Sequence, residues 1–234
     1  MEGFYVTSFS NGRPTLTTNF MKLRTLLFVL TVSTLFGYAQ TREIYVNPEF
    51  NTLAKDHKTI AILPFKVIMK LRPKQMEQMT PEQLAQLQED EGLAVQSALQ
   101  TYFLKRKGQH DFAVSFQDLR TTNAHLAKLD LTAEDLDKYT PKELAEILEV
   151  DAVITGILST DKPMSEGASV ALGVIVGFYG PTNSGKCTIN INDGATGDLL
   201  WKYEKTLSRS LGSDTNTVIN TMMRKASRQL PYIN

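Results

Sequence analysis

The sequence predicts an α/β (α+β) fold: a single domain whose mixed β-sheet is flanked by helices, in the order β-α-β-α-β-β-β-β-α. Three observations favour this class. A nearly continuous apolar run rich in β-branched residues spans 149–160, which is typical of a buried central strand. A similar run lies upstream at 59–67. A short amphipathic helical pattern leads directly into the central run, as in the crossover connections of α/β layers.

The composition is that of a globular protein with a hydrophobic core. The 234 residues suit one domain with extensions, or at most two small domains. Hydrophobic residues make up 42% and charged residues 21%, and the net charge is zero. Without the first 39 residues the chain has 22 basic and 24 acidic residues, a net charge of −2. This balance gives no argument for binding to nucleic acid, and we expect no nucleic-acid partner.

Residues 21–39 have the pattern of a cleavable signal peptide. Lys22 and Arg24 supply the positive charges, and an apolar run of eleven residues follows them. This run is too short to span a bilayer stably. Small residues then precede a cleavage site between Ala39 and Gln40. The pattern predicts an exported protein.

Residues 1–20 are polar and lack periodicity, so we interpret them as an extension from a wrongly chosen start codon upstream of Met21. The alternative is a cytoplasmic tail before a membrane anchor. A bacterial lipoprotein needs cysteine at the first mature position, where this chain has Gln40, so no lipid anchor is predicted. The single cysteine, Cys187, excludes an intramolecular disulfide, and a buried or edge thiol is expected.

The mature chain divides into a linker or edge segment, 40–57, and an α/β domain, 58–234. The first strand is expected at 59–67, with Pro64 marking its end or a bulge, because proline cannot donate to a ladder. We interpret residues 68–79 as a solvated loop; the alternative is an insertion that touches a membrane or a partner.

Two helices are predicted from matching start patterns. Thr80 and Gln83 form a capping box before a helix that extends to about residue 107, with a bend expected at Gly92. A second strand is expected at 112–116 and a short helix at 121–128. Thr140 begins another capping box, and its helix leads into the central strand.

The C-terminal half is predicted to form strands followed by a helix. The apolar run 169–179 is expected to be a buried strand. Apolar and polar residues alternate in 188–192, and a turn follows at 193–197. Leu199, Trp201 and Tyr203 then occupy every second position after the turn. This pattern predicts a β-hairpin. Ser213-Asp214 then caps the last helix.

Residues 180–186 have the glycine and lysine spacing of a P-loop. Cys187 stands where a P-loop needs Ser or Thr, and the next residues alternate as a strand instead of opening a helix. A hairpin loop is therefore the favoured interpretation. A nucleotide-using enzyme built on this loop is the least favoured of our hypotheses.

No catalytic, cofactor-binding or metal-binding residues are predicted. The three histidines, His57, His110 and His125, stand far apart and are interpreted as surface or loop residues. Trp201 and Tyr203 are candidate partner contacts because aromatic residues dominate interfaces, but their alternation with Leu199 favours core packing.

Three segments together resemble a known family. They are Thr-Ile-Ala-Ile-Leu-Pro-Phe at 59–65, Leu-Ala-Glu-Ile-Leu-Glu-Val-Asp-Ala-Val-Ile-Thr-Gly at 144–156, and 193–201 with its ending Thr-Gly-Asp-Leu-Leu-Trp. They resemble CsgG-like and TolB amino-terminal-like periplasmic domains, a group that includes LpoB-type activators. The resemblance covers residue 58 to the C-terminus. The signal peptide is similar to those of Bacteroidetes proteins.

The resemblance implies a protein without enzymatic activity or cofactor, in the periplasm or at the outer-membrane periphery of a Gram-negative bacterium. It implies a binding or assembly accessory module that acts through contacts with envelope proteins or through self-association. Membrane contact stays open, without a lipid anchor. The alternative is a subunit of an oligomeric outer-membrane secretion or transport channel of CsgG type.

Overall fold

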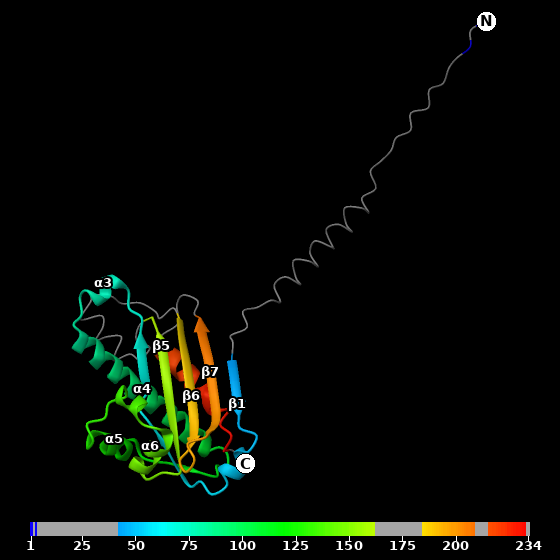
Figure 1. The fold of residues 1–234 in the computed structure, drawn as a ribbon. Helices are drawn as coiled ribbons and strands as arrows, with labels where there is room; N and C mark the ends of the chain where they lie inside the picture. Colours follow the sequence, from blue (N-terminus) through cyan, green and yellow to red (C-terminus); the bar gives the residue numbers. More distant parts are fainter. Residues whose placement is uncertain (2, 4–41, 162–183, 209–214, 233–234) are drawn as a thin grey trace. The chain divides into compact units, whose positions relative to one another are not determined.

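The computed structural model describes residues 1, 3, 42–161, 184–208 and 215–232. Its centre is a seven-stranded mixed sheet in the order β1-β7-β6-β5-β2-β4, with β3 also pairing with β5 (Figure 1). The strands are β1 (Arg42–Val46), β2 (Thr59–Ile62), β3 (Lys66–Met69), β4 (Ser115–Phe116), β5 (Ala152–Thr160), β6 (Ser184–Asp193) and β7 (Leu199–Ser208). The helices are α2 (Phe50–Leu53), α3 (Pro73–Met76), α4 (Pro81–Lys107), α5 (Leu119–Ala127), α6 (Pro141–Leu148) and α8 (Thr215–Ser227), with a 3₁₀ turn η1 (Asp135–Lys138). The predicted fold class is confirmed.

Strand β5 is the central strand that the sequence predicted. It pairs in parallel with β2 and β3 on one side and antiparallel with β6 on the other. Ala152, Val153, Ile154 and Leu158 are completely buried. A strand that pairs on both edges and is covered by a core on both faces requires such an apolar run. The run in the sequence therefore predicted this strand correctly.

Pro64 interrupts the predicted strand 59–67, as expected. Ile62 pairs with Ile154 and Lys66 with Ile157, so three residues (63–65) face two residues (155–156) across the ladder. The extra residue makes a bulge that divides the predicted strand into β2 and β3. The proline lies at this bulge, where its missing N–H breaks no ladder bond.

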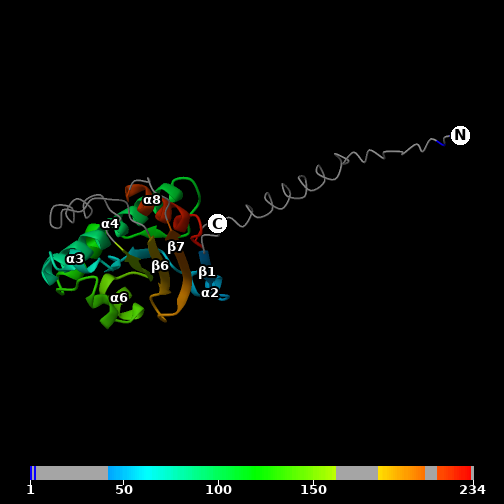
Figure 2. The same cartoon turned by 90° about the horizontal axis from the view of Figure 1, so that it is seen from above.

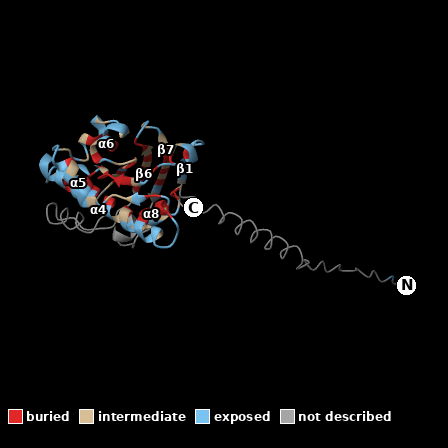
Figure 3. Cartoon of the chain, turned by 90° about the horizontal axis from the view of Figure 1, so that it is seen from below, coloured by how far each residue is buried: buried red, intermediate tan, exposed pale blue. Residues whose placement is uncertain are grey.

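Helices cover the two faces of the sheet unequally. Helices α4 and α8 lie on one face, and α6 lies on the other (Figure 2). The first face holds the larger core, which includes Leu99 and Phe103 of α4 and Met222 of α8. The second core is smaller and gathers Leu126, Leu144 and Leu148 over one end of the sheet. Buried residues accordingly concentrate where helices meet strands (Figure 3).

Both predicted capping boxes are present. The Thr80 N–H donates to Gln83 Oε1 at 2.9 Å, and the Gln83 N–H donates to Thr80 Oγ1 at 3.3 Å. At α6 the Thr140 N–H donates to Glu143 Oε2 at 2.7 Å, and the Glu143 N–H donates to Thr140 Oγ1 at 3.2 Å. The hydrogen bonds that the Glu143 carboxylate accepts from the N–H and from the hydroxyl of Thr140 lower the pKa of Glu143 below its usual value.

Other boundaries differ from the predictions. The segment 68–79 is not a simple loop, because its first two residues complete β3 and its middle forms α3. The predicted strand 112–116 keeps only Ser115–Phe116, and the helix expected at 121–128 begins at Leu119 after its N-cap Asp118. Within 40–57, residues 42–46 form the edge strand β1. The predicted strand 169–179 and the cap Ser213-Asp214 lie outside the described residues.

Glu149 ends α6 in the left-handed conformation, with φ 55° and ψ 49°. A side chain with a Cβ is disfavoured there by about 1 kcal/mol, whereas glycine is not. We expect Glu149→Gly to raise the free energy of unfolding by about 0.5–1 kcal/mol in urea denaturation. The matched control is Glu146→Gly inside the same helix, which should lower it by about 1 kcal/mol. Equal losses in both variants would contradict the prediction.

Candidate interaction surface

Strand β1 lies at one end of the sheet and exposes apolar side chains. It pairs antiparallel with β7, and no described strand pairs with its outer edge. Ile44, Tyr45 and Val46 are 38%, 44% and 46% exposed. Ile44 and Val46 share the face of their partners Tyr203 and Trp201, whereas Tyr45 lies on the opposite face. The edge therefore presents apolar surface on both faces of the sheet.

The backbone of β1 adds hydrogen-bonding groups to this edge. The Asn47 N–H donates to the Leu200 carbonyl oxygen at 2.8 Å, so it points toward β7. Successive residues of a strand alternate in direction, so the N–H and C=O groups of Val46 and Ile44 point away from β7. Edge strands that expose apolar side chains can pair with strands of other chains.

The face opposite α4 and α8 is polar beyond the small core. Lys186 Nζ lies 2.6 Å from Glu204 Oε1, and Lys202 Nζ lies 3.7 Å from Glu204 Oε2. The hydrogen bond from Lys186 is the main reason that the pKa of Glu204 is below its usual value. These pairs are partly exposed, so they keep this face soluble and add little to stability.

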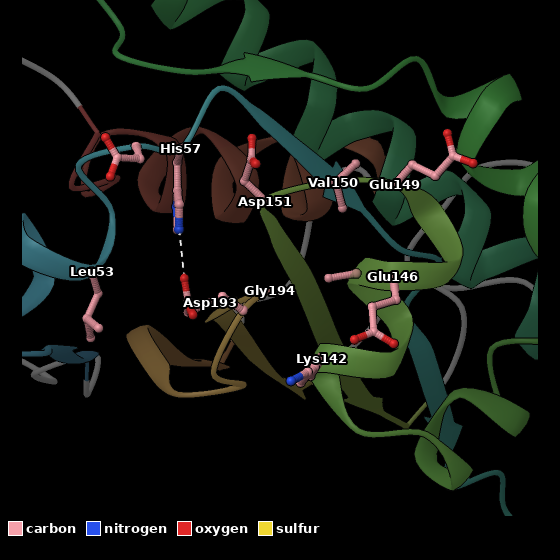
Figure 4. A pocket seen from close by; sticks show the side chains of 12 residues that line it. Leu53, His57, Lys142, Glu146, Glu149, Val150, Asp151, Asp193 and Gly194 are labelled. Atoms are coloured by element: carbon pink, nitrogen blue, oxygen red, sulfur yellow. Dashed lines mark hydrogen bonds and ion pairs between the residues drawn. The ribbon is translucent and has the colours of Figure 1, made fainter.

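A cavity of about 660 Å³ lies beside the start of β5. Its wall is formed by α6, which contributes Lys142 and Glu146, and by His57 and Asp193 from the strand ends (Figure 4). The residues that line this cavity include more acidic than basic side chains.

Three buried side chains form a network behind this cavity. His57 Nε2 lies 2.8 Å from Asp193 Oδ1, and His57 Nδ1 lies 2.8 Å from the Tyr232 hydroxyl oxygen. An ionised Asp193 only accepts, so Nε2–H donates to it, and in the tautomer that carries its proton on Nε2 the Nδ1 atom accepts from the tyrosine hydroxyl. Asp193 Oδ2 also accepts the Thr196 N–H at 2.6 Å. Both carboxylate oxygens are occupied.

Burial and hydrogen bonding set the acidity of this network. Burial raises the pKa of Asp193, but hydrogen bonds from Thr196 and His57 outweigh it, and the net pKa is lowered. Burial, together with the charges of Asp193 and Asp151, raises the pKa of Tyr232 well above its usual range. The tyrosine stays neutral and the aspartate stays charged. The network thus joins three distant parts of the chain.

Asp151 ties the same region together through the backbone. Its Oδ2 accepts the N–H groups of Lys58 and Thr59, both at 2.8 Å. Its carbonyl oxygen accepts the Gly194 N–H at 2.8 Å. One residue therefore joins the starts of β2 and β5 to the β6–β7 turn.

His57 lies in the loop between α2 and β2, but it is buried at the centre of the network and not at the surface. His110 is exposed, and half-buried His125 bonds through Nδ1 with the Ile147 carbonyl oxygen at 3.0 Å. No local pattern distinguishes His57 in the sequence, because its partners lie 136 and 175 positions away.

Trp201 and Tyr203 are completely buried, and their rings stack with centroids 5.9 Å apart. Their side chains pack in the larger core and do not reach the surface in this structure. Contact with a partner through them would need an opening of that core. The predicted cleavage site between Ala39 and Gln40 lies outside the described residues and stays a prediction.

The P-loop hypothesis fails on the structure around Lys186. This residue lies in strand β6, and its ammonium group pairs with Glu204. A P-loop lysine would instead begin a helix whose N-terminus faces the phosphates. Residues 180–183 lie outside the described residues.

Cys187 is buried, and burial alone raises its pKa to about 12. An unfolded thiol ionises near pH 8.5, so between about pH 9 and 12 the unfolded chain releases a proton that the folded chain keeps. The stabilisation is complete below the unfolded pKa and is lost as the pH rises. We expect the free energy of unfolding to fall by about 1.4 kcal/mol per pH unit there.

Denaturant titrations of the wild type and of Cys187→Ala at several alkaline pH values measure this slope. The variant should lack this contribution, while Tyr232→Phe should keep it. A thiol reagent should react with Cys187 only after unfolding. Rapid labelling of the native chain would contradict the assignment.

In the parts of the chain that the structure describes, no three His, Cys, Asp or Glu side chains are grouped to hold a metal ion. Among the same residues, no helix combines the length and apolar character needed to cross a membrane.

No protein-family model and no curated protein matches the chain. Several solved structures are distantly similar to it. The PelC dodecamer from Paraburkholderia phytofirmans is 14% identical, with 80% of this chain and 94% of that chain covered and a TM-score of 0.41. Lipoprotein GNA1162 from Neisseria meningitidis is 12% identical, with 74% and 98% covered and a TM-score of 0.35. The LpoB C-terminal domain from Salmonella enterica is 9% identical, with 69% and 94% covered and a TM-score of 0.33.

At these values the likeness is distant and says nothing of function. LpoB, which the sequence resemblance included, is among these neighbours. The CsgG-like and TolB-like resemblance stays a prediction.

Proposed function

We propose that this chain is an exported, non-enzymatic binding or assembly accessory module of the bacterial cell envelope. It binds a protein partner along the outer edge of β1, where the partner adds a strand to the sheet. The proposed location rests on the signal-peptide pattern of residues 21–39.

The observation that carries this proposal is the exposure of Ile44, Tyr45 and Val46 on an edge strand. Edge strands of soluble proteins are normally protected by charges, prolines or covering loops. In strand addition, main-chain hydrogen bonds supply affinity and alternate side chains supply specificity. The outward N–H and C=O groups of Ile44 and Val46 provide the main-chain contacts, and the exposed side chains of Ile44, Tyr45 and Val46 provide the side-chain contacts.

The first experiment identifies the partner. A photo-crosslinking amino acid replaces Tyr45 in the native host, and adducts are identified by mass spectrometry. The control position is Thr206, which is exposed on β7 of the same sheet. We expect a defined adduct from position 45 and none from position 206.

The second experiment tests strand addition with the purified partner. Val46→Pro removes the outward N–H, and Val46→Thr keeps it with a side chain of similar shape. We expect Val46→Pro to weaken binding about tenfold, because a main-chain hydrogen bond and the edge geometry are lost, and Val46→Thr to change it little. Equal binding by the two variants, with both folded by circular dichroism, would refute strand addition.

The same adducts distinguish the alternative function. If the species crosslinked at position 45 is another copy of this chain within a large, detergent-dependent assembly, the channel-subunit hypothesis replaces the accessory module. A hetero-adduct with a soluble or peripheral envelope protein supports the accessory module.

A further inference from the structure

The sheet has a second open edge, at strand β3. This strand pairs in parallel with β5 on one side, and no described strand pairs with its other side. The Lys70 N–H donates to the Thr160 carbonyl oxygen at 2.8 Å, so it points toward β5. Because backbone groups alternate in direction along a strand, the N–H and C=O groups of Val67 and Met69 point away from β5. Within the described residues, no backbone hydrogen bond reaches these outward groups.

The outer side of β3 has space for another strand. A groove of about 210 Å³ lies beside Val67, with Ala85 and Gln88 of α4 on one side and Thr132 on the other. Ile68, on the face of β3 opposite α4, is 40% exposed. The edge of β3 therefore presents main-chain groups, a groove and an exposed apolar side chain.

The two open edges stand at opposite ends of the sheet and run in opposite directions. Strand β1 is antiparallel to β7, β7 to β6 and β6 to β5, whereas β5 and β3 are parallel. Strand β1 is therefore antiparallel to β3. When a second copy of the chain continues the sheet in the same orientation, its β1 comes to lie antiparallel beside β3 of the first copy.

We propose that the strand added at β1 belongs to a second copy of this chain, and that it is β3 of that copy. The inference rests on the proposed function, because it names the strand that fills the β1 edge. It is supported by three kinds of complementarity between the two edges: in their hydrogen-bonding groups, in their apolar side chains and in their charges.

The hydrogen-bonding groups match in one register. When Ile44 lies opposite Met69, Val46 lies opposite Val67. The backbone groups of all four residues point outward, so each pair can exchange two hydrogen bonds. All four side chains also lie on the face that α4 and α8 cover. A shift by one residue would oppose outward to inward groups and would exchange the faces.

The exposed side chains match in the same register. Tyr45 then lies opposite Ile68 on the other face, and the two side chains are 44% and 40% exposed in the single chain. Glu43 lies opposite Lys70, and both are exposed. Aromatic–aliphatic pairs and opposite charges stabilise neighbouring strands when they face each other directly. The pairing thus covers the apolar side chains at both edges and brings two opposite charges together.

This contact joins two different edges, so each added copy leaves one edge open for the next. Such head-to-tail contacts build rings or open chains. A contact of about four residue pairs is small, so we expect assembly that depends on protein concentration and needs no detergent. Detergent-dependent assembly would instead mark the channel-subunit hypothesis.

The test is disulfide formation between two variants. In the proposed register Tyr45 and Ile68 form a pair without mutual hydrogen bonds, whose Cα atoms lie about 4.5 Å apart, and this separation permits a disulfide. The exported Tyr45→Cys and Ile68→Cys chains are purified separately from the native host and mixed under mild oxidation. We expect a disulfide-linked dimer in the mixture and none from either variant alone. The native Cys187 is buried and does not compete.

Ile157→Cys is the matched control for Ile68→Cys. Ile157 lies on the same face and is also 40% exposed, but it belongs to the central strand β5. Its mixture with Tyr45→Cys should give no dimer, and a dimer there equal to that with Ile68→Cys would overturn the proposal. A dimer from Tyr45→Cys alone would also overturn it, because β1 would then pair with β1 of the second copy.

Charge reversal gives a second test that needs no cysteine. Glu43→Lys and Lys70→Glu each place like charges opposite one another, and we expect either change to raise the dissociation constant about fivefold in analytical ultracentrifugation. The double variant restores an opposite pair and should assemble like the wild type. Lys142→Glu on α6, away from both edges, should leave the dissociation constant unchanged. A double variant that assembles no better than the single variants would overturn the proposed register.

Failure of this inference can be told from failure of the proposed function. If the mixture gives no disulfide while photo-crosslinking at position 45 captures a different protein, self-pairing is overturned and strand addition at β1 stands. If position 45 captures no protein at all, the proposed function fails as well.

Discussion

Replacing Gly92 with alanine is expected to lower the free energy of unfolding by about 3 kcal/mol or more. A Cβ at this position would lie 2.2 Å from the carbonyl oxygen of Phe65, which is backbone and cannot rotate away. The two backbones are already joined, because the Phe65 N–H donates to the Gly92 carbonyl oxygen at 3.4 Å. Relief of the clash would push α4 away from the sheet and open the larger core.

The packing of the Phe65 side chain leaves little room for its backbone to move away from an added Cβ. The Phe65 ring is completely buried and lies over Gly156 of β5, where an added Cβ would be 2.1 Å from the ring. Phe65 is thus held between two glycines. Gly92 therefore matters for close approach of helix and strand, and this is a stronger requirement than the bend expected from the sequence.

Gly108 provides the matched control for this variant. It ends α4 with φ −69° and is exposed, and an added Cβ would meet its nearest atom at 3.6 Å. We expect Gly108→Ala to leave the free energy of unfolding unchanged or to raise it by up to about 1 kcal/mol. Chemical denaturation followed by circular dichroism compares the two. Similar stabilities of Gly92→Ala and Gly108→Ala would contradict the close-packing argument.

Asp193→Ala is the second substitution with a large expected effect, a loss of about 3 kcal/mol in the free energy of unfolding. The change removes the acceptor of His57 and the acceptor of the Thr196 N–H. It leaves a buried imidazole N–H without its partner and releases the β6–β7 turn. The C-terminal segment should loosen as well, because Tyr232 is held through the same imidazole.

Two variants calibrate this loss. Tyr232→Phe removes one hydrogen bond at the end of the network and should cost about 1 kcal/mol. Asp198→Ala, at an exposed position in the same turn, should change stability by less than about 0.5 kcal/mol. If Asp193→Ala were no more harmful than Asp198→Ala, the network would not stabilise the fold.

The acid side of the stability profile gives an independent check. The pKa of Asp193 is lowered in the folded chain, so its contribution is present above the unfolded value, near pH 4, and is lost as the pH falls. Denaturant titrations between pH 6 and 2 should show a shallower acid decline for Asp193→Ala than for the wild type. Parallel declines would mean that Asp193 is not the titrating group.

Elements whose causes are local could be predicted from the sequence. Thr80 and Thr140 begin helices because their partners stand three residues away, and the β6–β7 hairpin forms around a turn whose residues are contiguous. Strand β5 was recognisable because burial on both faces requires a continuous apolar run. Pro64 predicted the end or bulge of the strand because a residue without a backbone N–H cannot donate a ladder hydrogen bond in any sheet.

Contacts between distant segments became visible only in the folded chain. The sequence left 40–57 as a linker or an edge segment, because β1 is short and its ladder partner β7 begins more than 150 positions later; the exposure of Ile44, Tyr45 and Val46 could not be predicted. The cleft lined by Thr155, Asn190 and Tyr139 likewise exists only where η1 and α6 fold over the sheet. The burial of His57 in its loop could not be predicted, because its two partners come from the β6–β7 turn and from the C-terminal segment. Periodicity reports on neighbours along the chain, whereas edges, clefts and buried networks are made by neighbours in space.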